Sequence, residues 1–166
     1  MFRELKAEEI ECRVGTCNQN GVSLLLYKDA RVDRAVLDET VGAFNWQCAF
    51  SEHKGTLFCR VGIRADSGEW VWKEDAGSPS NMEAQKGEAS DAFKRACFKW
   101  GIGKELYTAP FIWIPAQNCT IQQGRNGKPA CYDRFEVERI RVEGGRITGL
   151  SIVNAKTRQR VHVWTA

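Results

Sequence analysis

A cluster of positively charged residues is the strongest indication of chemistry in this sequence. Lys94 and Arg95 are adjacent, and Lys99 follows about one helical turn later. Cations grouped on one surface bind the phosphates of nucleic acids, with an affinity that falls as salt rises. Acidic residues share the same polar side, so a solvated helix face with weak ion pairs is the alternative interpretation.

Arg60 and Arg64 form a second group of cations, on one face of a predicted strand. Phe58 lies on the same face, which makes it a candidate for stacking on nucleic-acid bases. Trp70, Trp72 and Tyr107 are further candidates for stacking, but for Trp70 and Trp72 packing in the core under a helix is the favoured interpretation. If the rims of helix and strand converge, Arg60 and Arg64 extend the cationic surface into a groove.

Signatures of catalysis are scarce. Glu69, Glu74 and Asp75 can serve a metal-dependent nuclease only if their carboxylates converge on a cation, and this stays open as an alternative function. The segment Gly101–Glu105 resembles a phosphate-binding loop, but it lacks the full motif and follows a predicted helix instead of a strand. We therefore expect a protein that is not an enzyme, with no catalytic residue, no metal site and no cofactor.

Seven cysteines without a Cys-x-x-Cys pair favour free thiols in a reducing compartment. Cys48, Cys59 and Cys97 are expected to be small buried hydrophobic residues. No apolar signal segment follows Met1, and no apolar stretch approaches the length that spans a membrane. We expect a cytoplasmic protein that makes no contact with membranes.

The elements that position these residues are predicted from apolar periodicity. Alternation predicts strands over residues 10–16, 22–27, 46–50, 57–63, 69–73, 111–115, 135–142, 146–153 and 160–164. Helical spacing predicts one helix that ends near Gly42 and another that begins near Glu83 and stops at Gly101 and Gly103. The fold class is therefore α+β: an antiparallel β-β-β-α core with an N-terminal hairpin and helix, plus a C-terminal β meander.

Three stretches, in this order, resemble the annealing core of the Rad52 family of single-strand annealing proteins, above all its short bacterial and phage members. They are Tyr27–Val32 leading to Phe44–Trp46, Arg60–Arg64 leading to Gly77, and Lys86–Ala96 followed by Trp100 and Gly101. The resemblance covers about residues 10–108 of what we expect to be a single domain, 1–166. It assigns no role to residues 109–166.

The resemblance implies an oligomeric protein that binds single-stranded DNA and anneals complementary strands without ATP. Such proteins act in homologous recombination and double-strand break repair, as recombinase mediators. They form closed rings or helical filaments, with phosphates held in an inner groove and bases exposed for pairing. The implied partners are single-stranded DNA and further copies of the chain. A single-strand-binding protein or a phage or host recombination exonuclease is a further candidate.

Residue by residue, the resemblance places Arg31, Lys94 and Arg95 on the DNA backbone in the inner groove. It places Arg64 in an outer, second DNA site, and Lys86 at a basic position at the start of the helix. The family has a further arginine where this chain has Phe98, with Lys99 beside it.

Two other functions remain as alternatives to annealing. One is the metal-dependent nuclease, and the other is a non-catalytic protein-interaction module whose cations are only solvated. If the protein is an annealing oligomer, the expected contacts between subunits are the apolar segment Phe111–Ile114 and unpaired sheet edges.

Overall fold

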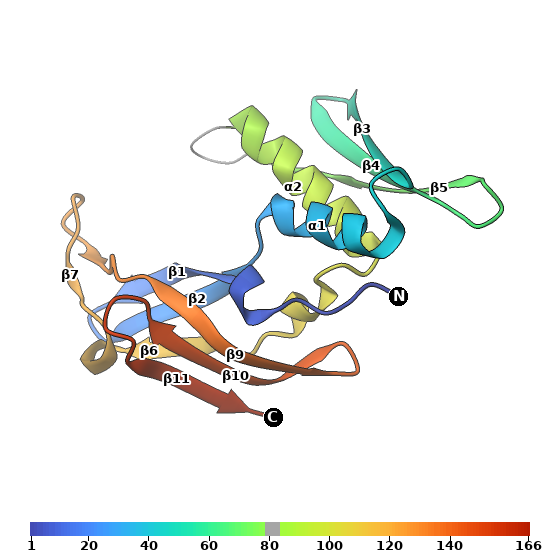
Figure 1. The fold of residues 1–166 in the computed structure, drawn as a ribbon. Helices are drawn as coiled ribbons and strands as arrows, with labels where there is room; N and C mark the ends of the chain where they lie inside the picture. Colours follow the sequence, from blue (N-terminus) through green and yellow to red (C-terminus); the bar gives the residue numbers. More distant parts are fainter. Residues whose placement is uncertain (79–83) are drawn as a thin grey trace. The chain divides into compact units, whose positions relative to one another are not determined.

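The computed structural model describes residues 1–78 and 84–166, with the side chains of 84–86 excepted. Within them the chain forms two compact units (Figure 1). The first unit consists of Met1–Arg3 and Ala30–Gly103, and the second of Glu4–Asp29 and Lys104–Ala166. The predicted α+β class with antiparallel sheets is confirmed. Neither of the two α-helices in this part of the chain has the length and apolar character that a membrane crossing requires.

The first unit is a three-stranded antiparallel sheet with two helices. Its strands are β3 (Trp46–His53), β4 (Thr56–Arg64) and β5 (Trp70–Ala76), paired in that order. The helices are α1 (Ala30–Val41) and α2 (Ala84–Lys99), and α2 lies across the sheet (Figure 1). The predicted β-β-β-α order is thus confirmed, with short turns joining the strands.

The core of this unit forms where α2 meets the central strand. Phe93, Ala96 and Cys97 of α2 are buried, as are Cys59 and Val61 of β4. Successive residues of a strand point to opposite faces. The odd-numbered residues of β4 therefore face α2, and the even-numbered ones face away. Val36 and Leu37 of α1 join the same core.

Both helices end at glycines, as the sequence predicts. Gly42 has φ 83° and its N–H donates to the Asp38 carbonyl. Gly101 has φ 93°, a left-handed conformation that favours glycine, and the N–H of Ile102 donates to the carbonyl of Cys97. This bond satisfies a carbonyl at the helix end that has no partner within the helix.

Two predictions about the core are wrong. Trp70 and Trp72 do not pack under the helix: they are 37% and 36% exposed. Their strand pairs with β4 so that Trp72 lies opposite Gly62, on the face turned away from α2. Cys48 is also exposed, whereas Cys59 and Cys97 are buried as expected. All seven cysteines are free.

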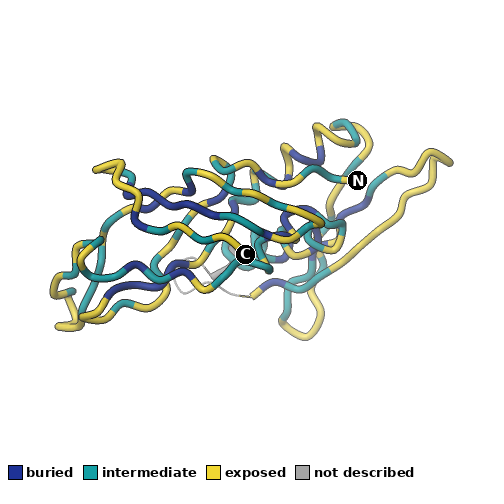
Figure 2. The backbone as a smooth tube through the Cα atoms, turned by 90° about the horizontal axis from the view of Figure 1, so that it is seen from below, coloured by how far each residue is buried: buried dark blue, intermediate teal, exposed yellow. Residues whose placement is uncertain are grey.

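The second unit is built on a six-stranded antiparallel sheet in the order β11-β10-β9-β1-β2-β6. The strand bounds are Glu11–Asn18 (β1), Gly21–Tyr27 (β2), Ile112–Pro115 (β6), Phe135–Glu143 (β9), Arg146–Asn154 (β10) and Arg160–Thr165 (β11). Buried and exposed residues alternate along parts of this backbone, most regularly in β9 (Figure 2). The predicted N-terminal hairpin and C-terminal meander are both present.

Shorter elements complete the second unit. A small hairpin pairs β7 (Gln122–Gln123) with β8 (Pro129–Ala130). Three 3-10 helices are η1 (Ala7–Glu9), η2 (Lys104–Thr108) and η3 (Ala116–Asn118).

The N-terminal hairpin and the C-terminal strands share one sheet. β2 pairs with β6, and β1 meets β9 through the pair Glu11 and Glu136. A division at residue 108 therefore separates strands that are hydrogen-bonded neighbours. That residues 1–166 act as a single domain, as expected from the sequence, stays a prediction.

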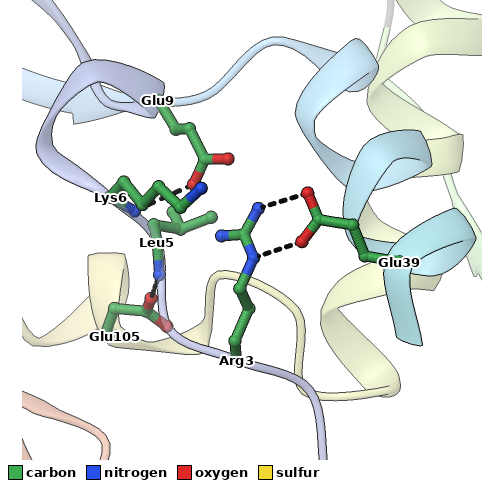
Figure 3. A network of polar contacts seen from close by, with 6 residues as sticks. All are labelled: Arg3, Leu5, Lys6, Glu9, Glu39 and Glu105. Atoms are coloured by element: carbon green, nitrogen blue, oxygen red, sulfur yellow. Dashed lines mark hydrogen bonds and ion pairs between the residues drawn. The ribbon is translucent and has the colours of Figure 1, made fainter.

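In each unit, hydrogen bonds hold part of the N-terminal segment in place. In the first unit, Nε of Arg3 donates to Glu39 of α1 at 2.6 Å, and its Nη2 donates to the second carboxylate oxygen at 3.3 Å (Figure 3). In the second unit, the N–H of Leu5 donates to Oε1 of the buried Glu105 at 2.7 Å (Figure 3).

Candidate nucleic-acid interface

The predicted cations of α2 lie on the side of the helix away from the core. Because Phe93, Ala96 and Cys97 are buried against the sheet, the helical period turns Arg95 and Lys99 outward, one turn apart. Their side chains are 46% and 47% exposed. The residues therefore present two long cationic side chains to solvent in one row.

A carboxylate of the neighbouring strand partly neutralises this row. The two carboxylate oxygens of Asp75 on β5 lie 3.6 Å from Arg95 Nη2 and 3.6 Å from Lys99 Nζ. Lys99 Nζ also donates to the carbonyl of Glu74 at 2.6 Å. Lys73 Nζ in turn donates to the carbonyl of Lys99 at 2.9 Å. Lys99 is thus bound to the backbone of β5 and is less free to move than an ordinary surface lysine.

Lys94 differs from its neighbours. It is half-buried, and it makes no ion pair with any residue in the described ranges 1–78 and 84–166. An ammonium group held near the surface without a counter-ion keeps its full attraction for a phosphate. Lys94 and Arg95 together therefore form the part of α2 that is best able to hold an anion.

Within the described part of the chain, the acidic residues of α2 form no ion pair with these cations. Oε1 of Glu88 accepts from the N–H of Leu57 at 3.1 Å, and Oδ2 of Asp91 accepts from the N–H of Ser78 at 3.0 Å. Both carboxylates thus satisfy backbone amides at the ends of strands. The alternative interpretation, a helix face saturated by its own ion pairs, does not describe this arrangement.

Arg31, predicted for the inner groove, and Lys86, predicted at the start of the helix, belong to the same unit. Arg31 is exposed in the first turn of α1. The buried residues of α1 share a core with Phe93 of α2, and the guanidinium of Arg34 lies 5.3 Å from the centre of the Phe93 ring. Lys86 lies in the first turn of α2, and its side chain is outside the described part of the structure.

Arg60, Arg64 and Phe58 lie on the other side of the sheet. They alternate along β4 with the buried Cys59 and Val61, so they face away from α2. The expectation that they line one groove together with the cations of α2 is not met, because the sheet lies between them. The placement of Arg64 in a second DNA site stays a prediction.

We call this opposite side the outer sheet face. It is formed by every second residue of the three strands: Gln47, Ala49 and Ser51 of β3, Phe58, Arg60, Gly62 and Arg64 of β4, and Trp70, Trp72 and Glu74 of β5. Arg60 stacks on Trp72, with the guanidinium 4.7 Å from the ring centre. The ring of Phe58 meets that of His53 edge to face, with centres 5.4 Å apart.

The carboxylates considered for a nuclease do not converge. Glu74 and Asp75 are consecutive residues of β5, so their side chains point to opposite faces of the sheet. Asp75 faces two cations of α2, and Glu69 lies outside the strand, within 3.4 Å of the Ser67 hydroxyl. Among the described residues, no three side chains of metal-ligand type gather into a site.

Sequence reasoning missed two features of the interface. One is the pairing of Asp75 with Arg95 and Lys99, which joins residues about twenty positions apart and depends on the packing of α2 on β5. The other is the exposure of Trp70 and Trp72. The spacing of two residues between these tryptophans shows that they share a strand face, but it does not show which face is buried.

Comparison with known proteins assigns the chain to a family. The family model that describes Rad52/22 family double-strand break repair proteins matches residues 3–124. The match covers well over half of the chain, so the protein belongs to this family. The strands β9, β10 and β11 lie beyond the matched range. No curated protein and no solved structure matches the chain significantly.

Proposed function

We propose that this protein binds single-stranded DNA as a homo-oligomer and anneals complementary strands without ATP in homologous recombination and double-strand break repair. The observation that carries the proposal is the adjacent pair of cations on α2, the half-buried Lys94 and the exposed Arg95, in a chain of the Rad52/22 family. One oxygen each of Glu88 and Asp91 accepts from a backbone amide, and among the described residues neither carboxylate forms an ion pair with these cations.

The mechanism requires only physical steps. Lys94, Arg95 and Lys99 carry a local surplus of positive charge over Asp75, the carboxylate that pairs with Arg95 and Lys99. This surplus attracts phosphates and releases the counter-ions condensed on the strand, which favours binding. Neutralised strands repel each other less, so complementary bases can approach and pair. Base pairing then supplies both the specificity and the driving force, and no bond is made or broken by the protein.

Assembly of several copies is part of the proposal, because one subunit has few cations. Copies arranged in a ring or filament hold one strand at many points, which raises the effective concentration of each contact. In the second unit, Phe111 is 78% exposed beside the edge strand β6, and its ring stacks on Trp113 at 6.3 Å. Ile112 and Ile114 are buried, so of the expected apolar segment Phe111 is the residue most open to a neighbouring subunit.

The double variant Lys94→Ala/Arg95→Ala tests the proposal. It should fold and assemble like the wild type, yet bind labelled oligo(dT) weakly and lose most of the ATP-independent annealing of complementary oligonucleotides. The matched control is Arg125→Ala/Lys128→Ala, which removes two exposed cations from the hairpin of β7 and β8. Mass photometry reports assembly, and circular dichroism reports the fold.

Three results would contradict the proposal. The first is normal annealing by the Lys94→Ala/Arg95→Ala variant. The second is a wild type that does not bind single strands even at low salt, as a pure protein-interaction module would behave. The third is Mg²⁺-dependent cleavage of the strand that Glu74→Ala abolishes. A cytoplasmic location, a single-strand-binding protein and a recombination exonuclease as further partners remain parts of the proposal that need separate tests.

A further inference from the structure

The outer sheet face carries two exposed tryptophans that the proposed phosphate-binding helix leaves unexplained. Trp70 and Trp72 are 37% and 36% exposed, and their ring centres lie 6.1 Å apart with planes inclined by 33°. More than a third of each tryptophan is thus open to solvent, and adjoining exposed apolar surface is typical of interaction sites. Two tryptophans side by side on the exposed face of a sheet therefore indicate a binding surface.

The ring of Trp72 is held flat against the sheet. Its cross-strand partner is Gly62, and a Cβ atom at Gly62 would lie only 2.7 Å from the ring. The missing side chain lets the indole lie directly on the backbone of β4. The guanidinium of Arg60 lies over the ring, 4.7 Å from its centre, so a base that stacks on Trp72 must take the place of this guanidinium. The indole is thus fixed in orientation before any ligand arrives, which lowers the entropy lost on binding.

Cations and small residues surround the two rings. Arg60 and Arg64 lie on the same face as the tryptophans, and Arg64 is the cross-strand partner of Trp70. The adjacent strand β3 contributes Ala49 and Ser51 to this face, side chains too short to cover the rings. The face also carries Gln47, opposite Gly62, and one acid, Glu74, opposite Arg60. It therefore combines flat aromatic surface with two arginines against one carboxylate.

We infer that Trp70 and Trp72 stack on the bases of single-stranded DNA while Arg60 and Arg64 contact its phosphates. Aromatic residues interleaved with cations bind single strands without reading their sequence. This inference rests on the proposed single-strand binding and adds to it a base contact on the sheet face opposite Lys94 and Arg95. The two surfaces use different physical interactions: phosphate attraction at the helix, and base stacking at the outer sheet face.

A second copy of the chain fits this face less well than a nucleic acid. If two copies met face to face about a two-fold axis, the four arginines of both would be brought into one contact with only the two copies of Glu74 as counter-charges. The centres of protein interfaces are depleted in charged residues, and like charges at close range oppose association. Phosphates, in contrast, supply negative charge that pairs with Arg60 and Arg64.

An abasic oligonucleotide separates stacking from phosphate contact, because it keeps the phosphates and lacks the bases. The full-length wild type should bind oligo(dT) more tightly than an abasic strand of equal length. In Trp70→Leu/Trp72→Leu, affinity for oligo(dT) should fall by at least about tenfold while affinity for the abasic strand stays unchanged. Trp70→Tyr/Trp72→Tyr should keep most of the preference for bases, since tyrosine also stacks. Phe44→Leu, at an aromatic residue that is 95% exposed outside this face, is the control and should change neither affinity.

Each other outcome overturns the inference in a recognisable way. Unchanged oligo(dT) binding by the leucine variant shows that the tryptophans do not touch bases, and leaves the proposed function standing. Equal losses on both strands, or no rescue by tyrosine, show a structural effect instead of stacking. A change in oligomeric state without loss of base preference identifies the face as a contact between copies. If the wild type binds neither strand, the proposed function fails as well.

Discussion

Oδ1 of Asp75 on β5 lies 3.6 Å from Nη2 of Arg95 on α2. The second oxygen of the same carboxylate lies 3.6 Å from Nζ of Lys99. Neither distance is that of a short hydrogen-bonded pair, and both cations stay half exposed, so the two attractions are weak and easily exchanged. An anion such as a phosphate can therefore replace Asp75 as the partner of Arg95, as the proposed function requires.

Removing the charge of Asp75 should strengthen single-strand binding. Asp75→Asn keeps the shape of the side chain and removes the carboxylate that competes with phosphate. We expect the affinity for oligo(dT) at low salt to rise several-fold, and the gain to shrink as added salt screens the charges. Fluorescence anisotropy across a salt series measures it. Asp66→Asn, the same change in an exposed turn, is the control. An affinity that is unchanged or lower in Asp75→Asn would show that Arg95 does not bind phosphate.

The contact between Gly62 and Trp72 should be visible in stability. In Gly62→Ala the new Cβ would lie 2.7 Å from the Trp72 ring, so the ring must move. We expect the free energy of unfolding to fall by about 1–3 kcal/mol, the usual cost of overpacking. Urea denaturation measures the change.

A double-mutant cycle provides the control for this contact. In a Trp72→Ala background the ring is gone, so Gly62→Ala should cost much less than in the wild type. Equal costs in both backgrounds would mean that the ring does not lie on Gly62 in solution.

Cys48 should be the most reactive of the seven thiols. A hydrogen bond from the Cys59 thiol, with a smaller contribution from the nearby Arg34, holds the pKa of Cys48 well below its ordinary value. The reactive thiolate is therefore populated at lower pH than in a free cysteine. Burial raises the pKa of Cys12 to about 12, so Cys12 should stay unreactive near neutral pH.

Alkylation by iodoacetamide, followed site by site with mass spectrometry, checks this order. Cys59→Ala should slow the reaction of Cys48 near neutral pH, because it removes the hydrogen bond that stabilises the thiolate. Faster labelling of Cys12 than of Cys48, or no effect of Cys59→Ala, would contradict the assignment.

The ion pair of Glu138 and Arg160 should protect the second unit against acid. Nε of Arg160 donates to Glu138 at 2.7 Å, and the hydrogen bonds from Arg160 and then Ser151 lower the pKa of Glu138 from 4.5 to about 2. Because the pKa is lowered in the folded state, the stabilisation is complete above about pH 4.5 and is lost as the pH falls toward 2.

An NMR titration of the Glu138 carboxyl carbon measures this shift directly. Arg160→Gln should return the midpoint toward its ordinary value, whereas Arg158→Gln, which removes the partner of Glu136, should leave it in place. A wild-type midpoint near 4.5 would show that the pair does not persist in solution.

Local patterns in the sequence were sufficient for the two α-helices and for the strands of the two larger sheets. Alternation predicted the strands of both units, and helical spacing with left-handed glycines at Gly42 and Gly101 predicted the two helices. These signals succeed because each depends on neighbours within one or two turns of the chain. The outward position of Arg95 on α2 follows from the same spacing, and so does family membership, which three short motifs in order indicated.

Pairings between distant residues were decided only in the folded chain. The sequence around Glu11 and around Glu136 does not indicate that β1 pairs with β9, because strand pairing depends on the whole sheet. The same holds for β5: alternation separates Trp72 from Lys73 but does not tell which side is buried. The indole rings of Trp70 and Trp72 were predicted as core residues because they are apolar. The register instead places Trp72 over Gly62, where β4 has no side chain. Lys73 therefore points toward Trp100 and the end of α2. Tertiary packing thereby exposed the tryptophans and divided the predicted cations between two faces of one sheet.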